Sequence, residues 1–241
     1  MIMKPYFYSS AEVKANQLVC YYFENIDLFD CRADFKDILS SRELEVYGSK
    51  LGESRLLYCS NKLLLRLALG SYMGLAPGLV EFDYKFAKPE VKSDIITDFN
   101  ISHSARAMAI VITGSGKSGV DLEFIREIKY RQQIAARLFS DREQRMLVAC
   151  EYNSKEFIRL WTMKEAAVKC AGHGMFKHAS LYDLSSPELK FRKKSLAMQV
   201  FVHELPRAFI SLAYTAKIDS VIYSSFNFKS ENYKRELFGT T

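Results

Sequence analysis

Two acidic residues, Asp121 and Glu123, lie two positions apart in the stretch "GVDLEFI". The alternation predicts a β-strand with both carboxylates on one face and Val120, Leu122 and Phe124 on the other. An ordinary half-buried strand with one solvent-exposed face would show the same alternation without any metal site. Two neighbouring carboxylates repel each other, however, and a divalent cation relieves that repulsion better than water does. Such hard oxygen ligands suit Mg²⁺, which commonly binds through one or two carboxylates and substrate phosphates.

A second group of charged residues interrupts the apolar stretch "LWTMKEAAVKCAGHG", which predicts a helix ended by glycine. Lys164 points into its apolar sector, although a lysine stem can also extend its amine to water. Glu165 and Lys169 are four residues apart, the spacing of a surface ion pair contributing about 0.3–0.5 kcal/mol. The sharper hypothesis is a metal site of Asp121, Glu123 and Glu165, with both lysines near phosphate charge. The spacing alone does not bring the helix and the strand together.

Polar residues elsewhere are candidates for binding an anion. His103 lies in "FNISHSA" between predicted strands, next to Ser102, and small hydroxyl side chains suit a phosphate. A lone histidine is more often structural. Lys62 lies among leucines of a predicted helix and Lys88 precedes a proline in a predicted turn, and both positions also suit an ordinary solvated lysine.

Composition limits the classes of protein. The net charge is +6 with 49% hydrophobic residues, which argues against disorder and favours an anionic partner. No stretch of eighteen apolar residues predicts a membrane span, and the first twenty residues do not resemble a signal peptide. The five cysteines are scattered without a C-x-x-C pair, which favours reduced thiols and a cytoplasmic location.

The elements that must position these residues predict an α+β fold. A helix is expected from Glu53 through "SRLLYCSNKLLLRLALGSYMG", with Ser140 or Asp141 capping a later helix and Ser154 capping the "WTMKEA" helix. "RAMAIVIT" and "RAFISLAYT" each follow a strong helix by about 40 residues, a faint internal repeat. We therefore expect two similar halves, each a helix packed on a small, mainly antiparallel sheet. "GSGKS" joins them and divides the chain into 1–116 and 117–241.

Four motifs in order resemble those of a known family. "FNISHS", "GVDLE", "FSDREQRML" and "WTMKEAAVKCAGHG" are similar to the motif series of the Sfp-type 4′-phosphopantetheinyl transferases. The resemblance covers roughly residues 85–176. It implies a pseudo-dimer of two α+β halves with coenzyme A between them. It also implies transfer of 4′-phosphopantetheine from coenzyme A to a serine hydroxyl of an apo acyl or peptidyl carrier protein, with release of 3′,5′-ADP.

The resemblance also implies roles for individual residues. Asp121, Glu123 and Glu165 would hold Mg²⁺, and Lys169 would act near the transferring β-phosphate, with Glu165 or a water taking the serine proton. The residues expected to contact the cofactor are Lys62, Lys88, Ser102, His103, Lys164 and Lys169. The carrier protein is expected to be acidic, which the positive charge of this chain complements. A cytoplasmic monomer is expected, without a nucleic-acid or membrane partner.

The sequence departs from the family pattern near the nucleotide and leaves other functions open. Ala87 stands where the family often has glycine, and the N-terminal arginine pattern is blurred, with Lys62, Arg55 and Arg66 as candidates. A Mg²⁺-dependent phosphodiesterase or nuclease is one alternative, although Ile125 occupies the place of its usual lysine. The others are a non-catalytic protein that binds anionic partners and a family member without transferase activity.

Overall fold

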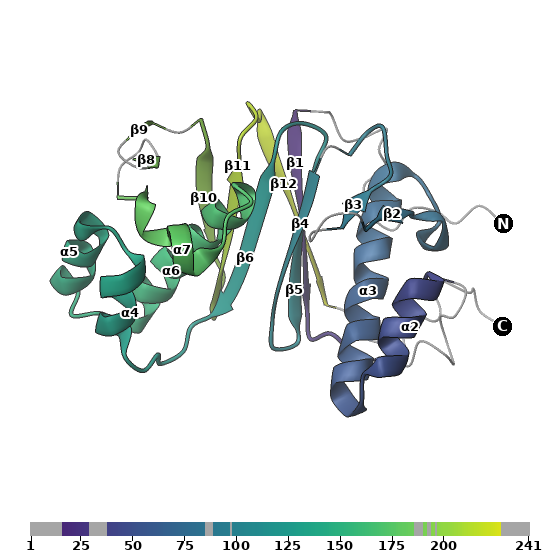
Figure 1. Ribbon diagram of the computed structural model, residues 1–241, viewed down its shortest axis with the longest axis horizontal. Helices are drawn as coiled ribbons and strands as arrows, with labels where there is room; N and C mark the ends of the chain where they lie inside the picture. Colours follow the sequence, from purple (N-terminus) through teal and green to yellow (C-terminus); the bar gives the residue numbers. More distant parts are fainter. Residues whose placement is uncertain are drawn as a thin grey trace.

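The computed structural model describes residues 16–28, 38–84, 89–96, 98–185, 190–191, 194–195 and 197–227. Its elements are helices and mainly antiparallel sheets, which confirms the predicted α+β class. Figure 1 shows two main sheets in the middle of the molecule, with helix α3 outside one sheet and helix α6 outside the other. The order of layers is therefore helix, sheet, sheet, helix.

The first sheet has four strands in the order β12-β1-β5-β4. β1 pairs antiparallel with β5, and β5 antiparallel with β4, whereas β12 lies parallel to β1 at the other edge. Helix α3 packs against this sheet, and α2 packs against α3. The bounds of these elements are β1 Gln17–Glu24, β4 Asp98–Ser104, β5 Ala107–Thr113, β12 Ser220–Asn227, α2 Ser41–Ser49 and α3 Gly52–Met73.

The second sheet has three antiparallel strands in the order β10-β11-β6. Four helices lie along the chain between β6 and β10, and α6 is the one that packs against the strands. The bounds are β6 Ser118–Phe124, β10 Gln199–Glu204, β11 Ala208–Tyr214, α4 Arg131–Leu138, α5 Asp141–Ala149, α6 Ser154–Cys170 and α7 Met175–His178.

Short elements follow the long helix of each half. After α3 come a 3₁₀ helix and a two-stranded sheet, and after α6 come α7, a 3₁₀ helix and a three-stranded sheet. Their bounds are η1 Pro77–Leu79, β2 Phe82–Asp83, β3 Glu90–Val91, η2 Ala179–Leu181, β7 Tyr182–Asp183, β8 Lys190–Phe191 and β9 Lys194–Ser195.

Strand alternation divides the apolar residues among three cores. In β1, Val19 and Tyr21 face α3, whereas Leu18 and Cys20 face the second sheet. The core between the two sheets also takes residues from β5, β6 and β11, so the sheets pack face to face. The third core lies between α6 and the outer face of the second sheet. Strands buried on both faces explain why "RAMAIVIT" and "RAFISLAYT" are apolar almost throughout.

A buried ion pair fastens the long helix of the first half. Ser40 and Glu43 form a capping box at the start of α2, in which each side chain accepts from the other residue's backbone N–H. Arg66 of α3 donates to the 1%-exposed Glu43 at 2.8 Å. The same guanidinium donates to the carbonyls of Pro77 and Val80, at 3.2 and 2.7 Å. These contacts fix α2, α3 and η1 together.

The second half repeats this arrangement with a lysine. Ser140 and Glu143 form the capping box of α5, which confirms the predicted cap at Ser140. Lys164 of α6 donates to Glu143 at 2.6 Å and to the carbonyls of Ala179 and Tyr182 at 3.1 and 2.7 Å. In both halves the cation joins a capping-box glutamate to the two ends of a 3₁₀ helix. The repeat supports the predicted pair of similar halves.

Two local predictions need correction. The N-cap of α6 is Asn153, whose side chain accepts from the backbone N–H of Lys155 at 2.9 Å, and Ser154 is already the first helical residue. Cys59 is disulfide-bonded, so the expectation of reduced thiols is wrong at this residue. Within the described ranges, no helix combines the length and the apolar character needed to cross a membrane.

The proposed division at residues 116 and 117 stays a prediction. The "GSGKS" stretch does connect β5 of the first sheet to β6 of the second. Strand β12, although it belongs to the segment 117–241, lies in the first sheet beside β1. The two halves of the chain therefore do not correspond to two separate sheets.

Candidate active site

The site forms where α6 crosses β6, and a glycine permits the crossing. A Cβ at Gly119 would lie 2.1 Å from the carbonyl oxygen of Ala166 and 2.6 Å from the backbone nitrogen of Cys170. Helix and strand backbones therefore touch at this point. This close approach brings Glu165 and Lys169, which are one helical turn apart on α6, over the strand that carries the acidic pair.

Asp121 is the centre of the hydrogen-bond network at this crossing. It is 5% exposed, and its Oδ1 accepts from the Ser102 hydroxyl at 2.8 Å and from the Lys169 ammonium at 2.9 Å. Lys169 also donates to the Ser102 Oγ at 3.3 Å and to the carbonyl of Val120 at 3.2 Å. The Oδ2 of Asp121 is buried and has no hydrogen-bond partner among the residues that the structure describes. A buried carboxylate oxygen without a donor fits a cation ligand.

Glu123 lies one strand repeat beyond Asp121. Its Oε2 accepts from the Ser104 hydroxyl at 3.4 Å and from the Arg126 guanidinium at 3.2 Å. Burial raises the pKa of Glu123; Arg126 opposes this rise and the negative charge of Asp121 adds to it. A cation bound beside Glu123 would favour the charged carboxylate and lower this pKa.

Glu165 completes the acidic group. Burial raises the pKa of Glu165, the charges of Asp121 and Glu123 add to the rise, and Lys169 opposes it at 4.0 Å. The prediction placed these three carboxylates together, and their mutual charge effects are consistent with that. Among the described residues, however, no three acidic, histidine or cysteine side chains converge closely enough to hold a metal ion. The donor set fits Mg²⁺, which needs the carboxylate oxygens to turn toward one another.

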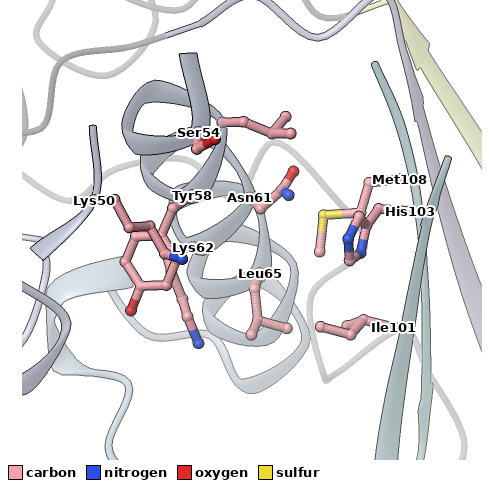
Figure 2. Close-up of a pocket in the computed structure, with 10 residues that line it drawn as sticks. Lys50, Ser54, Tyr58, Asn61, Lys62, Leu65, Ile101, His103 and Met108 are labelled. Carbon is pink, nitrogen blue, oxygen red and sulfur yellow. The ribbon is translucent and has the colours of Figure 1, made fainter. Parts of the chain in front are cut away.

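A cavity of about 330 Å³ lies on the other face of β4. Figure 2 shows the ring of His103 facing the side chains of α3 across this space, with Lys62 and Tyr58 on the far side. Lys50 and Asn61 also line it. Burial lowers the pKa of Lys62, although Glu43 opposes this. The structure thus places His103 and Lys62 in one pocket.

Ser102 and His103 are neighbours in sequence but face opposite sides of β4. Ser102 is 6% exposed and contacts Asp121 and Lys169, whereas His103 is exposed and lines the cavity. The expectation treated the two as one phosphate contact, and they instead lie in two places. Lys88 falls outside the described residues.

The structure corrects the prediction that Lys164 contacts the cofactor. Its side chain is 0% exposed, and its ammonium donates to Glu143, Ala179 and Tyr182 inside the core. Burial lowers the pKa of Lys164, and Glu143 opposes this. With its ammonium on three protein acceptors, Lys164 fastens α6 to α5 and η2 and has no surface for a phosphate.

Several residues at the site were missed by sequence reasoning. Ser104 contacts Glu123, Gly119 permits the helix crossing, and Lys50, Tyr58 and Asn61 line the cavity. For Ser104 a signal existed, since serine two positions beyond Ser102 in a strand must share its face. For the cavity no signal existed, because its lining comes from distant elements.

The segment that carries the site is also similar to known proteins. Residues 117–213, which contain Asp121, Glu123, Glu165 and Lys169, match one family model. It is the model of the 4′-phosphopantetheinyl transferase superfamily. The family resemblance stated from the motifs is therefore confirmed at the level of the superfamily, and the Sfp type within it stays a prediction.

Similar proteins support the same assignment. The chain is 34% identical over 131 residues to the 4′-phosphopantetheinyl transferase HetI of a Nostoc strain, covering 52% of this chain and 55% of that protein. It is 33% identical over 135 residues to the transferase gsp of Aneurinibacillus migulanus, covering 55% and 51%. It is 33% identical over 116 residues to a Bacillus subtilis 4′-phosphopantetheinyl transferase, covering 47% and 50%. The matches thus span about half the length of these relatives.

Proposed function

We propose that this protein is a Mg²⁺-dependent 4′-phosphopantetheinyl transferase. It transfers the 4′-phosphopantetheine group of coenzyme A to a serine hydroxyl of an apo acyl or peptidyl carrier protein. The observation that carries this proposal is the gathering of Asp121, Glu123, Glu165 and Lys169 at the crossing of β6 and α6, inside the segment that matches the superfamily. A partly exposed lysine beside a group of half-buried carboxylates suits chemistry on phosphate.

The reaction replaces a phosphoanhydride bond of coenzyme A with a phosphodiester bond to the carrier. The serine oxygen forms a bond to the β-phosphorus of coenzyme A, the bond from this phosphorus to the bridging oxygen breaks, and 3′,5′-ADP leaves with the electron pair. The serine proton goes to a base. Bound at Asp121, Glu123 and Glu165, Mg²⁺ would neutralise charge on the pyrophosphate.

The chain's own residues supply positioning and charge. Lys169 is held by Asp121 and Ser102 with 27% of its side chain exposed, so its ammonium can stabilise negative charge on the transferring phosphate. Glu165 lies 4.0 Å from the Lys169 ammonium, so its carboxylate, or a water beside it, would accept the serine proton. His103 and Lys62 line the cavity beyond β4, where we place the phosphorylated nucleotide.

Intact-mass spectrometry of an apo carrier protein tests the proposal. With this protein, coenzyme A and Mg²⁺, we expect the carrier to gain one phosphopantetheine, and chelation of Mg²⁺ should prevent the gain. Asp121→Asn should lower the rate by a factor of at least about 100, because it removes one carboxylate charge from the metal site. Unchanged turnover of this variant would contradict the metal assignment.

A matched control keeps the test specific. Glu156→Gln makes the same kind of change on α6, where Glu156 pairs with Arg159 at 2.8 Å, away from the acidic group. We expect it to retain wild-type transfer, whereas Glu165→Gln should lose it. A pair of variants with equal activity would count against Glu165 as a site residue.

The partner and setting are also part of the proposal. The net charge of +6 favours an acidic carrier protein, and we expect the enzyme to act as a monomer in the cytoplasm. The alternatives make different predictions: a phosphodiesterase would cleave substrate without modifying the carrier, and a non-catalytic binding protein would bind anions without either reaction.

A further inference from the structure

The two main sheets meet along one pair of edge strands. β4 is the last strand of the first sheet and β6 the last strand of the second. They lie alongside each other yet belong to different backbone hydrogen-bond ladders. Side chains from β4 therefore have to make the polar contacts across this junction.

Every second residue of β4 reaches across to β6. At one end the Asp98 carboxylate accepts from the backbone N–H of Ser118 at 2.8 Å, and the Asn100 amide donates to the Ser118 carbonyl at 3.4 Å. These contacts fix the register of the two strands. Further along the same face of β4, Ser102 and Ser104 contact the acidic pair of β6.

The two serines contact the two carboxylates in matching steps. Ser102 donates to Asp121 at 2.8 Å and Ser104 donates to Glu123 at 3.4 Å, and each pair is separated by 19 residues in the chain. A hydroxyl can donate one hydrogen bond and accept others. Ser102 uses both capacities, because it donates to Asp121 while it accepts from Lys169 at 3.3 Å.

We infer that Ser102 and Ser104 are positioning residues that orient Asp121 and Glu123 for a divalent cation. This inference rests on the proposed function. Ser102 and Lys169 both donate to Oδ1 of Asp121, and within the described ranges the buried Oδ2 has no donor, which leaves it for the cation. Ser104 plays the same part for Glu123, since Ser104 and Arg126 both donate to its Oε2.

The geometry assigns different roles to neighbouring residues of "SHS". On one face of β4, Ser102 and Ser104 donate hydrogen bonds to the carboxylates of β6. On the other face, His103 lines the cavity. The strand thus holds the cation-binding groups and the cavity at a fixed separation. Ser102 is therefore a residue that acts through Asp121, and its loss should weaken cation binding before it affects binding in the cavity.

Direct titration of the full chain with Mn²⁺, followed by electron paramagnetic resonance, tests the inference without any transfer reaction. Replacement of groups that orient metal ligands typically lowers affinity by about 10–100-fold. We expect Ser102→Ala to weaken Mn²⁺ binding by about tenfold, and Ser104→Ala to weaken it by less because its contact is longer. Ser102→Thr keeps the hydroxyl on a side chain that strands accommodate, and should restore most of the affinity.

Controls separate positioning from folding and from the proposed function. Ser49→Ala removes an exposed hydroxyl that donates to the Val46 carbonyl, and should bind Mn²⁺ like the wild type. The inference would be overturned if Ser102→Ala bound Mn²⁺ with unchanged affinity, or lost binding only in proportion to its unfolded fraction. It would also be overturned if the wild type bound no Mn²⁺. A wild type that binds Mn²⁺ through Ser102 but modifies no carrier would refute the transferase proposal alone.

Discussion

At the scale of single residues, the site holds the carboxylates of Asp121, Glu123 and Glu165 close enough to repel one another. Burial raises the pKa of Glu165, and the charges of Asp121 and Glu123 raise it further. Three carboxylates that can each lose a proton therefore lie near one ammonium, Lys169. Such an arrangement costs stability and is retained where function needs it.

The pH dependence of this cost gives a prediction. Because the pKa of Glu165 is raised in the folded state, its protonated form is favoured, and stability falls as pH rises through the folded pKa. Glu165→Gln should therefore stabilise the protein at pH 7 by roughly 0.5–2 kcal/mol. The difference should shrink as pH falls and vanish below the ordinary glutamate pKa. Urea unfolding at several pH values measures it, and a variant less stable at pH 7 would contradict it.

Lys164 gives a second prediction at this scale. Lys164→Met would leave Glu143 buried without its charged partner, which typically costs about 3–5 kcal/mol. Lys155→Met breaks the exposed pair with Glu204 and should change stability by less than about 0.5 kcal/mol. The folded fraction of the Lys164 variant should still bind coenzyme A in calorimetry. A stable variant that no longer binds it would restore Lys164 as a cofactor contact.

Sequence reasoning did well for the acidic residues and failed for this lysine. Alternation in "GVDLEFI" was enough to place Asp121 and Glu123 on one face. The helical pattern also placed Lys164 in an apolar sector correctly. What it could not show was whether the ammonium left that sector, because the three acceptors come from α5, η2 and β7.

At the scale of elements, the crossing of α6 over β6 determines whether the site exists. Gly119→Ala places a Cβ 2.1 Å from the Ala166 carbonyl, so helix and strand must separate. We expect a loss of stability of at least about 1–3 kcal/mol, the usual cost of overpacking, together with loss of Mn²⁺ binding. Gly174→Ala meets nothing within 4 Å and should be nearly neutral. Thermal unfolding and Mn²⁺ titration compare the two, and equal behaviour would show that the crossing tolerates a wider spacing.

Elements with local signals were predictable, and those without were not. The α3 helix ends at Gly74 with a left-handed φ of 70°, as its glycine indicated. The cap of α6 was misplaced by one residue, since Asn153 and Ser154 are both good caps and only the backbone geometry distinguishes them. The cavity beside His103 had no local signal, because α3 and β4 form it together.

At the scale of the whole molecule, the two halves share one core and one strand. The core between the sheets takes residues from β1, β5, β6 and β11, and β12 completes the first sheet. No pattern in the sequence could predict this, because pairing of Gln17 with Ser220 joins residues 203 positions apart. Pairings at such separations leave no periodic trace in either strand.

This shared core predicts cooperative unfolding. Trp161 is the single tryptophan of the chain and lies on α6, so its fluorescence reports on the second sheet and its helices. Circular dichroism reports on all helices and strands. We expect both signals to change at the same urea concentration, within error. Separate transitions would show that the halves unfold independently despite the shared core.

The parallel pairing of β12 with β1 also has a consequence during synthesis. The ribosome makes β1 well before its partner Ser220–Asn227, because Gln17 and Ser220 are 203 residues apart. Until then one edge of β1 has no strand beside it, and an open edge is a template for pairing with other chains. Contacts this distant in sequence also form slowly. Newly made chains therefore pass through a stage in which they are most exposed to aggregation, and chaperones that bind nascent chains should raise the yield most at that stage.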